Sequence, residues 1–199
     1  WASLRCEVLP AVRKCYLVPS AELAPIINCA YKLLRFRFHD ELFLCNRHCL
    51  SALIGQTQHD VATAADDGAQ WVMVLGIAGR GVLPRERVAL LEQDIAAIAG
   101  QFSLRLETTA CGVSAEAVGG AILQPSAEPY WKLRHTGGFH EIFFLTTLNR
   151  SQEFINALHE VAAVSRYPQN DIGVYIQPTH MGTSCHVEFH LPYDPENRE

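Results

Sequence analysis

The chain has 199 residues, 49% of them hydrophobic, which indicates a folded protein with a sizeable core rather than a disordered tail. Its formal net charge of −5 argues against a nucleic-acid-binding protein, because neutralising phosphates requires a basic face. No segment approaches the roughly 20 apolar residues of a membrane span, and no signal peptide is visible. The seven cysteines are an odd number in a chain of this size, which favours reduced thiols and a cytoplasmic protein.

The first part of the chain predicts one strand and one helix. Residues 12–18 partly alternate between apolar and polar side chains, as a strand does. Pro25 is tolerated only in the first turn of a helix, so the helix that Ser20 introduces is expected over residues 25–35. Residues 42–54 have a mixed pattern that predicts no element.

Residues 57–70 are polar and small, and we expect a surface connection there. This connection divides the chain into an N-terminal strand and helix segment, residues 1–70, and a domain over residues 71–199. Because the chain begins at Trp1 and ends soon after a predicted strand, both ends are expected to be cut from a longer polypeptide.

The pattern becomes sharper after residue 70. Residues 71–77 form an apolar run that predicts a buried strand, and residues 84–99 carry one apolar helical face that stops at Gly100. Residues 102–107 alternate again, with Phe102, Leu104 and Leu106 expected to point inward. Together these segments predict a β-α-β unit.

A second unit of the same plan follows. Residues 141–147 predict a strand, and Asn149 or Ser151 is expected to cap the next helix. Residues 172–177 and 185–191 predict two further strands. Two β-α-β units of similar size predict an α+β fold, with a ferredoxin-like antiparallel sheet and its helices on one face. The excursion over residues 108–140 is long for a compact domain, and such excursions are usually functional.

The last predicted strand carries the clearest candidate site. Since alternate residues of a strand share a face, Cys185, Val187, Phe189 and Leu191 should point to the core and His186, Glu188 and His190 away from it. This polar row is open to three interpretations: an exposed face that binds nothing, a metal-free wall of a pocket, or a metal site completed by His180.

A second group of candidate ligands lies near the N-terminus, at His39, Cys45, His48 and Cys49. Cys45 and Cys49 are four residues apart, a spacing that would place them on one helical face. Zinc sites need a second pair of ligands at a defined spacing, and none is present here. No metal site is therefore predicted from this group.

Paired glycines precede another histidine in Gly137-Gly138-Phe139-His140. Glycines let a backbone approach a flat ligand closely, which makes His140 a candidate cofactor contact, although a core or loop histidine is the alternative. The glycines of Gly79-Arg80-Gly81 and Gly119-Gly120 are expected to form turns. No phosphate-binding fingerprint and no nucleophile elbow occur in the chain.

The order of elements from Trp71 to Asp194 resembles the C-terminal cap domain of the vanillyl-alcohol oxidase and para-cresol methylhydroxylase family of flavoproteins. The run Gly138-Phe139-His140-Glu141-Ile142-Phe143-Phe144 is similar to a glycine-led, aromatic-rich strand of that family. His186 falls near the start of a histidine-rich strand, and Tyr193-Asp194 is similar to a tyrosine-aspartate strand end.

This resemblance implies the substrate-side domain of an enzyme that oxidises a small alcohol, phenol or other hydroxy compound by hydride transfer to FAD. It also implies that another domain of the same polypeptide holds most of the FAD, so that this chain is inactive alone. His140, or Tyr130, would be the residue that contacts or covalently binds the flavin. His186, His190 and Arg134 would assist the reaction by stabilising a developing phenolate.

Two other classes of function stay open on the sequence. One is a free-standing ferredoxin-like module that binds a small ligand and self-associates through a sheet edge. The other is a metal-binding module built on His180, His186, Glu188 and His190. Neither class includes a nucleic-acid or membrane partner.

Overall fold

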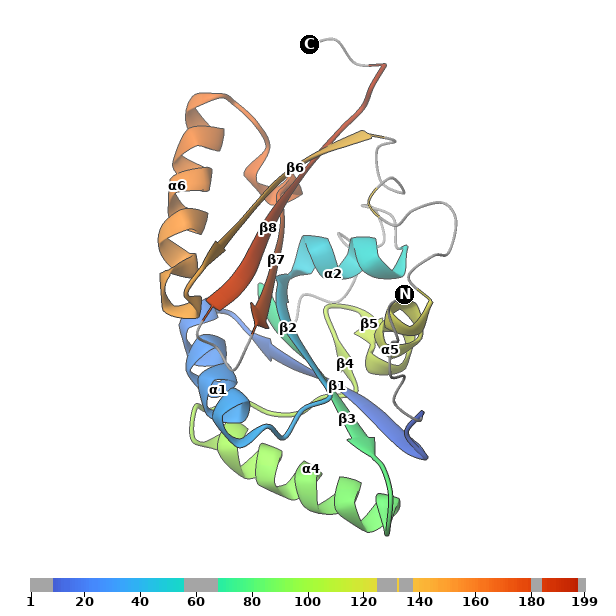
Figure 1. Ribbon diagram of the computed structural model, residues 1–199. Coiled ribbons are helices and arrows are strands. Elements are labelled where there is room, and N and C mark those ends of the chain that lie inside the picture. Colours follow the sequence, from blue (N-terminus) through green and yellow to red (C-terminus); the bar gives the residue numbers. More distant parts are fainter. Residues whose placement is uncertain (1–8, 56–67, 125–131, 133–137, 180–183, 197–199) are drawn as a thin grey trace, which may run out of the picture.

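A six-stranded antiparallel sheet forms the centre of the computed structural model, which describes residues 9–55, 68–124, 132, 138–179 and 184–196 (Figure 1). The strands lie in the order β1-β3-β2-β7-β8-β6. Their bounds are β1 Val12–Ser20, β2 Glu41–Asn46, β3 Trp71–Gly79, β6 Gly138–Thr146, β7 Gly173–Thr179 and β8 Ser184–Tyr193. A short hairpin of β4 (Thr109–Ala110) and β5 (Val113–Ser114) stands apart from this sheet.

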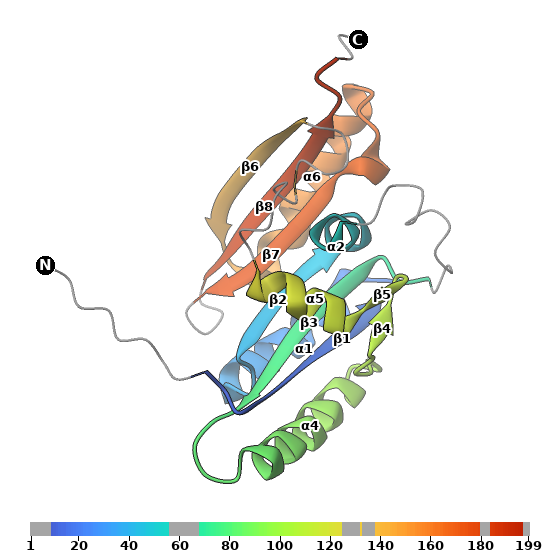
Figure 2. The same cartoon turned by 90° about the vertical axis from the view of Figure 1, so that its right-hand side faces the viewer.

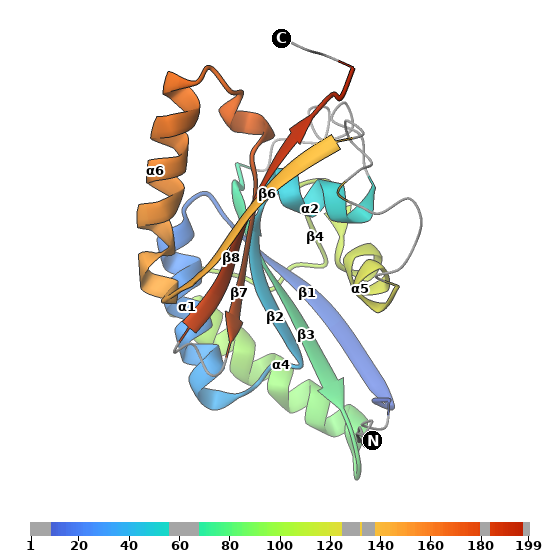
Figure 3. The same cartoon turned by 45° about the horizontal axis from the view of Figure 1, so that its top comes forward.

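Three long helices cover one face of the sheet: α1 (Leu23–Phe36), α4 (Pro84–Gly100) and α6 (Ser151–Val164). Two shorter helices, α2 (Arg47–Ile54) and α5 (Ala115–Leu123), lie on the other face (Figures 1 and 3). Short 3-10 turns, η2 (Leu148–Arg150) and η3 (Gln169–Asp171), flank α6. None of the helices in the described residues is both long and apolar enough to cross a bilayer.

The sheet consists of two halves with related plans. In the first half β1, α1, β2 and β3 follow one another, and β3 lies between β1 and β2. In the second half β6, α6, β7 and β8 follow one another, and β8 lies between β7 and β6. The halves join where β2 pairs with β7. The predicted α+β class, with an antiparallel sheet and the long helices on one face, is confirmed, whereas the name ferredoxin-like stays a prediction.

The strand predicted over residues 102–107 is wrong. This segment is a loop, and its one pairing with the sheet is an isolated bridge between Glu107 and Leu17. The neighbours of β3 come instead from the N-terminal segment, since β1 and β2 pair with β3 along its two edges. The sheet therefore extends across the predicted boundary at residue 70.

The segment that predicted no element, residues 42–54, contains a strand and a helix in direct succession. The strand β2 ends at Asn46, whose side-chain oxygen accepts a hydrogen bond from the Cys49 amide at 3.0 Å and so caps α2. Gly55 ends the helix in the left-handed conformation. Because the side-chain period changes within this short segment, neither element has a clear signature of its own.

The other helices agree with their predicted positions but differ in detail. Pro84 occupies the first turn of α4 as expected. The predicted cap of α6 is wrong, because neither Asn149 nor Ser151 caps it and the helix continues from the 3-10 turn η2. The prediction of a turn at Gly119-Gly120 is also wrong: both glycines lie inside α5, where Gly119 approaches the Cβ of Cys15 closely enough to leave little room for a side chain.

The two faces of the sheet carry separate hydrophobic clusters. The cluster on the side of the long helices joins both halves of the sheet, through residues such as Leu44, Met73, Ile176 and Val187. The cluster on the other side lies mainly over the first half, beneath α2, α5 and the β4–β5 hairpin, and Tyr175 of β7 packs against its edge; it includes Leu17, Phe43, Val72, Val74 and Val118. On this side, α5 and α2 lie in front of the first half, while β6 and β8 have no helix in front of them (Figure 2).

Candidate functional site

The polar row of β8 lies on the sheet face opposite the long helices, where α2 crosses the neighbouring strand β7 but no described helix lies in front of β6 and β8 (Figure 2). Cys185, Val187 and Phe189 belong to the core on the side of the long helices, as their alternation predicts. His186, Glu188 and His190 point the other way, beside Leu145, Phe143 and Glu141 of β6 in the strand register. Structure and sequence pattern therefore agree on which face of this strand is polar.

Glu188 is the centre of a hydrogen-bonded cluster. Its Oε1 accepts hydrogen bonds from the Lys132 ammonium and from Nε2 of His190, and its Oε2 lies 3.1 Å from Nε2 of His186. The Lys132 ammonium also donates to Glu141. Lys132 and His190 are buried, and Glu188 is nearly so. Such charge-assisted bonds hold the carboxylate in one orientation.

This arrangement determines the charges of the cluster. Burial alone would raise the pKa of Glu188, but hydrogen bonds from His190, Lys132 and His186 outweigh it and hold the pKa well below its usual value. Burial likewise disfavours the charged form of His190, yet its hydrogen bonds with Cys49 and Glu188 raise the pKa of His190 to about 9. Near neutral pH, Glu188 is therefore an anion and His190 a cation.

The same cluster contains part of the metal site that the sequence left open as an alternative. Glu141, Glu188 and His190 each offer an atom, and these atoms lie within 4.8 Å of one another. The Lys132 ammonium bonds both carboxylates, so it already supplies a positive charge between them. The geometry is that of an ion-pair network formed by side chains alone.

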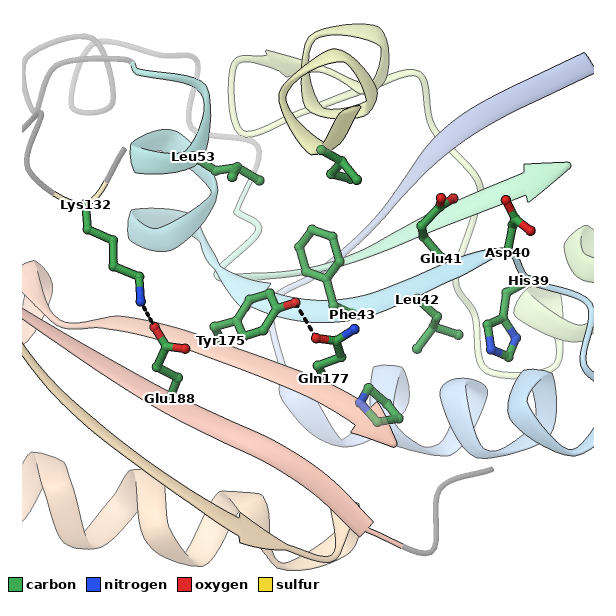
Figure 4. A pocket seen from close by; sticks show the side chains of 12 residues that line it. His39, Asp40, Glu41, Leu42, Phe43, Leu53, Lys132, Tyr175, Gln177 and Glu188 are labelled. Carbon is green, nitrogen blue, oxygen red and sulfur yellow. Dashed lines mark hydrogen bonds and ion pairs between the residues drawn. The ribbon is translucent and has the colours of Figure 1, made fainter. Parts of the chain in front are cut away.

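A cavity of about 450 Å³ opens beside this cluster (Figure 4). Lys132 and Glu188 line one end, and Phe43 and Tyr175 line the middle with their rings 5.1 Å apart. The Tyr175 hydroxyl donates to Oε1 of Gln177 at 2.9 Å, and burial raises the pKa of Tyr175, which therefore stays protonated. The cavity thus combines a charged end with an aromatic centre.

The far end of the cavity carries His39, Asp40 and Glu41. Glu41 forms an ion pair with Arg13 at 2.7 Å, and Asp40 forms one with Arg80. Burial lowers the pKa of His39, which favours its neutral form. Gly76 leaves room for Glu41, because a Cβ there would lie 2.0 Å from Oε2 of that carboxylate.

The candidate residues predicted from the sequence are only partly brought together. His186 and His190 meet at Glu188, whereas His140 lies on the opposite face of the sheet, where it stacks on Tyr193 at 4.8 Å. Tyr130, Arg134 and His180 lie outside the described residues. The roles predicted for all of these residues remain predictions.

The paired glycines have a local explanation. A Cβ on Gly138 would lie 2.8 Å from the ring of Tyr193, which is its partner in the register of β6 and β8. The flat group that approaches this glycine is therefore a side chain of the same sheet.

Sequence reasoning missed Lys132, Tyr175 and Cys49 as members of the site. Lys132 lies in the long excursion whose length did indicate a function. Tyr175 shares a predicted strand with apolar neighbours, and Cys49 approaches His190 only because α2 crosses β7. Of the three, the sequence carries a signal for Lys132, through the length of the excursion, and for Cys49, through its spacing from Cys45, but none for Tyr175.

Comparison with known proteins adds information about the fold. No protein-family model and no curated protein matches the chain. A structure of p-cresol methylhydroxylase with substrate bound matches with a TM-score of 0.61 and 13% identity, covering 94% of this chain and 40% of that chain. A structure of alkyldihydroxyacetonephosphate synthase matches with a TM-score of 0.61 and 11% identity over 92% of this chain and 37% of that chain.

A second structure of the synthase matches with a TM-score of 0.56 and 9% identity. This chain spans about two fifths of the length of the solved chains that it matches. The comparison confirms, at the level of the fold, the resemblance predicted from the residues between Trp71 and Asp194. The chain has the fold of one part of two larger enzymes of the FAD-linked oxidase family.

Proposed function

We propose that this chain is the substrate-side domain of an FAD-dependent oxidoreductase and that its cavity forms one wall of the substrate site. One observation carries the proposal: an ionised carboxylate, Glu188, is held by an ammonium and two imidazoles at the wall of a cavity that lies where the two halves of the sheet join, beside α2 and α5. A polar cluster ordered in this way has no role in the hydrophobic core, and ordered polar groups in a cavity are typical of binding sites.

The comparisons support a division of the cofactor site between this chain and another domain. The matched enzymes are more than twice as long as this chain, and the chain itself has no phosphate-binding fingerprint. Another part of the same polypeptide is therefore proposed to hold the FAD phosphates. The residues described here are proposed to form the ring side of such a site, because Phe43 and Tyr175 give the cavity an aromatic centre.

When bound, the flavin would accept a hydride from the substrate. The residues of this chain would bind, orient and desolvate that substrate. Phe43 and Tyr175 offer flat apolar surface to a small ring or chain, and Glu188 can accept a hydrogen bond from a substrate hydroxyl. Lys132 and the protonated His190 keep this carboxylate ionised and directed, so that it can accept the hydrogen bond and orient the hydroxyl.

The substrate class that fits this description is a small hydroxy compound, such as a phenol or an alcohol. His186 is half-buried and bonds Glu188 from beside the cavity rather than lining it, and its ring stacks on Phe143 at 5.9 Å. We propose His186, which is less buried than His190, as the histidine that contacts the substrate, with His190 behind it. Arg134, which lies outside the described residues, stays a proposed third contributor.

Two measurements on the longest native polypeptide that contains this chain test the proposal. The first is the absorbance spectrum of the purified protein, in which bound flavin is expected. The second is the rate of flavin reduction by p-cresol or 4-hydroxybenzyl alcohol. His186→Ala should slow this reduction about tenfold or more, since removing a polar group that contacts the transition state has effects of this size.

His159→Ala is the matched control. His159 lies on α6, behind the sheet, and the structure gives it no contact with the cavity. Its rate should stay near that of the native protein. A protein without flavin, or equal rates for the two variants, would contradict the proposal.

A further inference from the structure

We propose that Cys49 is a positioning residue for the cavity wall: it holds His190, and His190 in turn holds Glu188. The inference gives a role to a buried thiol that the proposed function does not use. Its importance for substrate rests on the proposed function, whereas the contacts themselves do not.

The first turn of α2 is fastened to β7 by one side chain. Oδ1 of Asn46 accepts hydrogen bonds from the amides of Cys49 and Val174, both at 3.0 Å. Nδ2 of Asn46 donates to the carbonyl of Ile172 at 2.7 Å. These three bonds use both polar atoms of the amide, so the start of the helix has little freedom to move relative to the strand. Cys49 is thereby placed over β7.

A glycine on β7 makes room for the histidine. Gly173 is opposite His190 in the strand register, and a Cβ at Gly173 would lie 3.1 Å from both Cβ and Nδ1 of His190. That distance is tighter than an ordinary contact, so the bare glycine lets the imidazole lie across β7 toward α2. The ring bonds with Glu188 of its own strand, and the thiol of Cys49 on α2 is close enough to raise the pKa of the ring.

The thiol is suited to this contact. Cys49 is the third residue of α2, where the positive end of the helix dipole favours an anion. The interactions of Cys49 with Cys45, at the end of β2, and with His190 outweigh burial and lower the pKa of Cys49 to about 6. Cys45 in turn has a raised pKa and stays protonated.

Cys49 and His190 can exchange a proton without changing their total charge. Moving the thiol proton of Cys49 to His190 gives a thiolate and an imidazolium, and the pair stays neutral overall. Among the described residues, the other charged or titratable groups around His190 include Glu188 and His186 of its own strand, Lys132, Glu141 opposite it on β6, and Tyr175 opposite Glu188 on β7. Lys132 opposes the positive charge on His190, so the thiolate and Glu188 together maintain it.

Cys49 affects the cavity indirectly, through His190 and Glu188. Cys49 is almost fully buried and does not line the cavity, whereas Glu188 does. A cationic His190 keeps this carboxylate ionised and directed. Loss of the thiolate should leave His190 with one anionic partner in place of two, and its pKa should fall.

The test compares Cys49→Ser with Cys185→Ser in the same native polypeptide, by NMR titration of the histidine rings. Cys185 is equally buried but lies on the other face of the sheet, in contact with the core. His190 should titrate near pH 9 in the native protein and in Cys185→Ser. In Cys49→Ser its midpoint should fall by about one pH unit or more. Equal midpoints in the two variants would overturn the inference.

A second measurement does not require Cys49→Ser to fold. Thiolate absorbance near 240 nm should rise in a step near pH 6 in the native protein. The thiols of Cys15, Cys29 and Cys185 do not interfere, because burial raises the pKa of each to about 11. His190→Gln should move the Cys49 step to higher pH, and a native protein without a step below pH 8 would overturn the inference.

Flavin reduction separates this inference from the proposed function. If flavin is bound, Cys49→Ser should change the pH profile of reduction by p-cresol, and Cys185→Ser should not. If the protein binds no flavin, the proposed function fails, but both titrations still decide whether Cys49 holds His190.

Discussion

The two halves of the sheet share a strand and helix plan but differ on the face away from the long helices. In the first half this face carries Leu17, Phe43 and Val74, and α2 and α5 cover it. In the second half it carries Glu141, Glu188 and the two histidines of β8, together with exposed Phe143 and Leu145. Side chains under a helix must be apolar to contribute to a core, whereas side chains on an uncovered face can be charged.

The comparison indicates where the molecule acts. The first half uses both of its faces for stability, and the second half uses only one. The free face of the second half borders one end of the cavity at the buried cluster of Glu188, and the other end of the cavity reaches the Arg13–Glu41 ion pair of the first half. Large apolar side chains next to these charges are also typical of a surface that another domain covers, as the proposed function requires.

The largest expected effect on stability comes from introducing one lysine on this face of either half of the sheet. Val74 is fully buried beneath the cover of the first half, and Leu145 on the second half is 71% exposed. Val74→Lys should lower the free energy of unfolding by about 4 kcal/mol or more, because it buries an unpaired ammonium. Leu145→Lys should change it by less than about 0.5 kcal/mol. Urea denaturation monitored by circular dichroism measures both.

The two lysine variants also test the comparison itself. If they lost similar stability in the isolated chain, the second half would be covered as tightly as the first. If Leu145→Lys were harmless in this chain but harmful in the longest native polypeptide, another domain would be shown to cover that face.

A smaller effect is expected from breaking the charge cluster of the second half. Lys132→Met leaves Glu188 and Glu141 without their shared ammonium, and removing one partner of a buried ion pair costs about 3 kcal/mol. Adding Glu188→Gln should recover part of this loss, because the uncompensated buried charge is then removed.

Lys14→Met is the matched control, because Lys14 also forms an ion pair, with Glu92, but its side chain is 46% exposed. Exposed pairs contribute little, so this variant should lose less than about 0.5 kcal/mol. Equal losses for the two lysine variants would mean that the cluster at Glu188 is not a buried network. Thermal unfolding at constant pH provides the measurement.

The parts of the fold that could be predicted are those with a uniform local pattern. The apolar run that forms β3, the single apolar face of α4 and the alternation along β8 each persist for several residues, so one period is clear. In contrast, β2 and α2 meet at Asn46 without a loop, and the alternation at residues 102–107 reflects a loop that buries Leu104 beside the sheet.

The candidate site was predictable to a similar, limited extent. Alternation placed His186, Glu188 and His190 on one face, because that placement depends only on neighbours in the chain. The contacts of Lys132 and Cys49 depend on how distant segments cross, and no local pattern encodes such a crossing. The glycine before Phe139 was interpreted as a place for a flat ligand, and the group found against it is the ring of Tyr193.

The smallest expected effect tests that glycine. In Gly138→Ala the new methyl group would meet the ring of Tyr193, which must move, and we expect a loss of about 1 kcal/mol. The loss should nearly vanish when Tyr193 is already alanine, since the clash is then gone. A double-mutant cycle by urea denaturation measures this coupling.

Gly120→Ala is the control with the opposite expected sign. Gly120 lies within α5 with no atom near the position of a Cβ, and alanine in a helix is favoured over glycine by up to about 1 kcal/mol. If Gly138→Ala were also neutral or stabilising, the space above Gly138 would be open. The ring of Tyr193 would then not be what occupies it, and a flat ligand beside His140 would again be the better interpretation of these paired glycines.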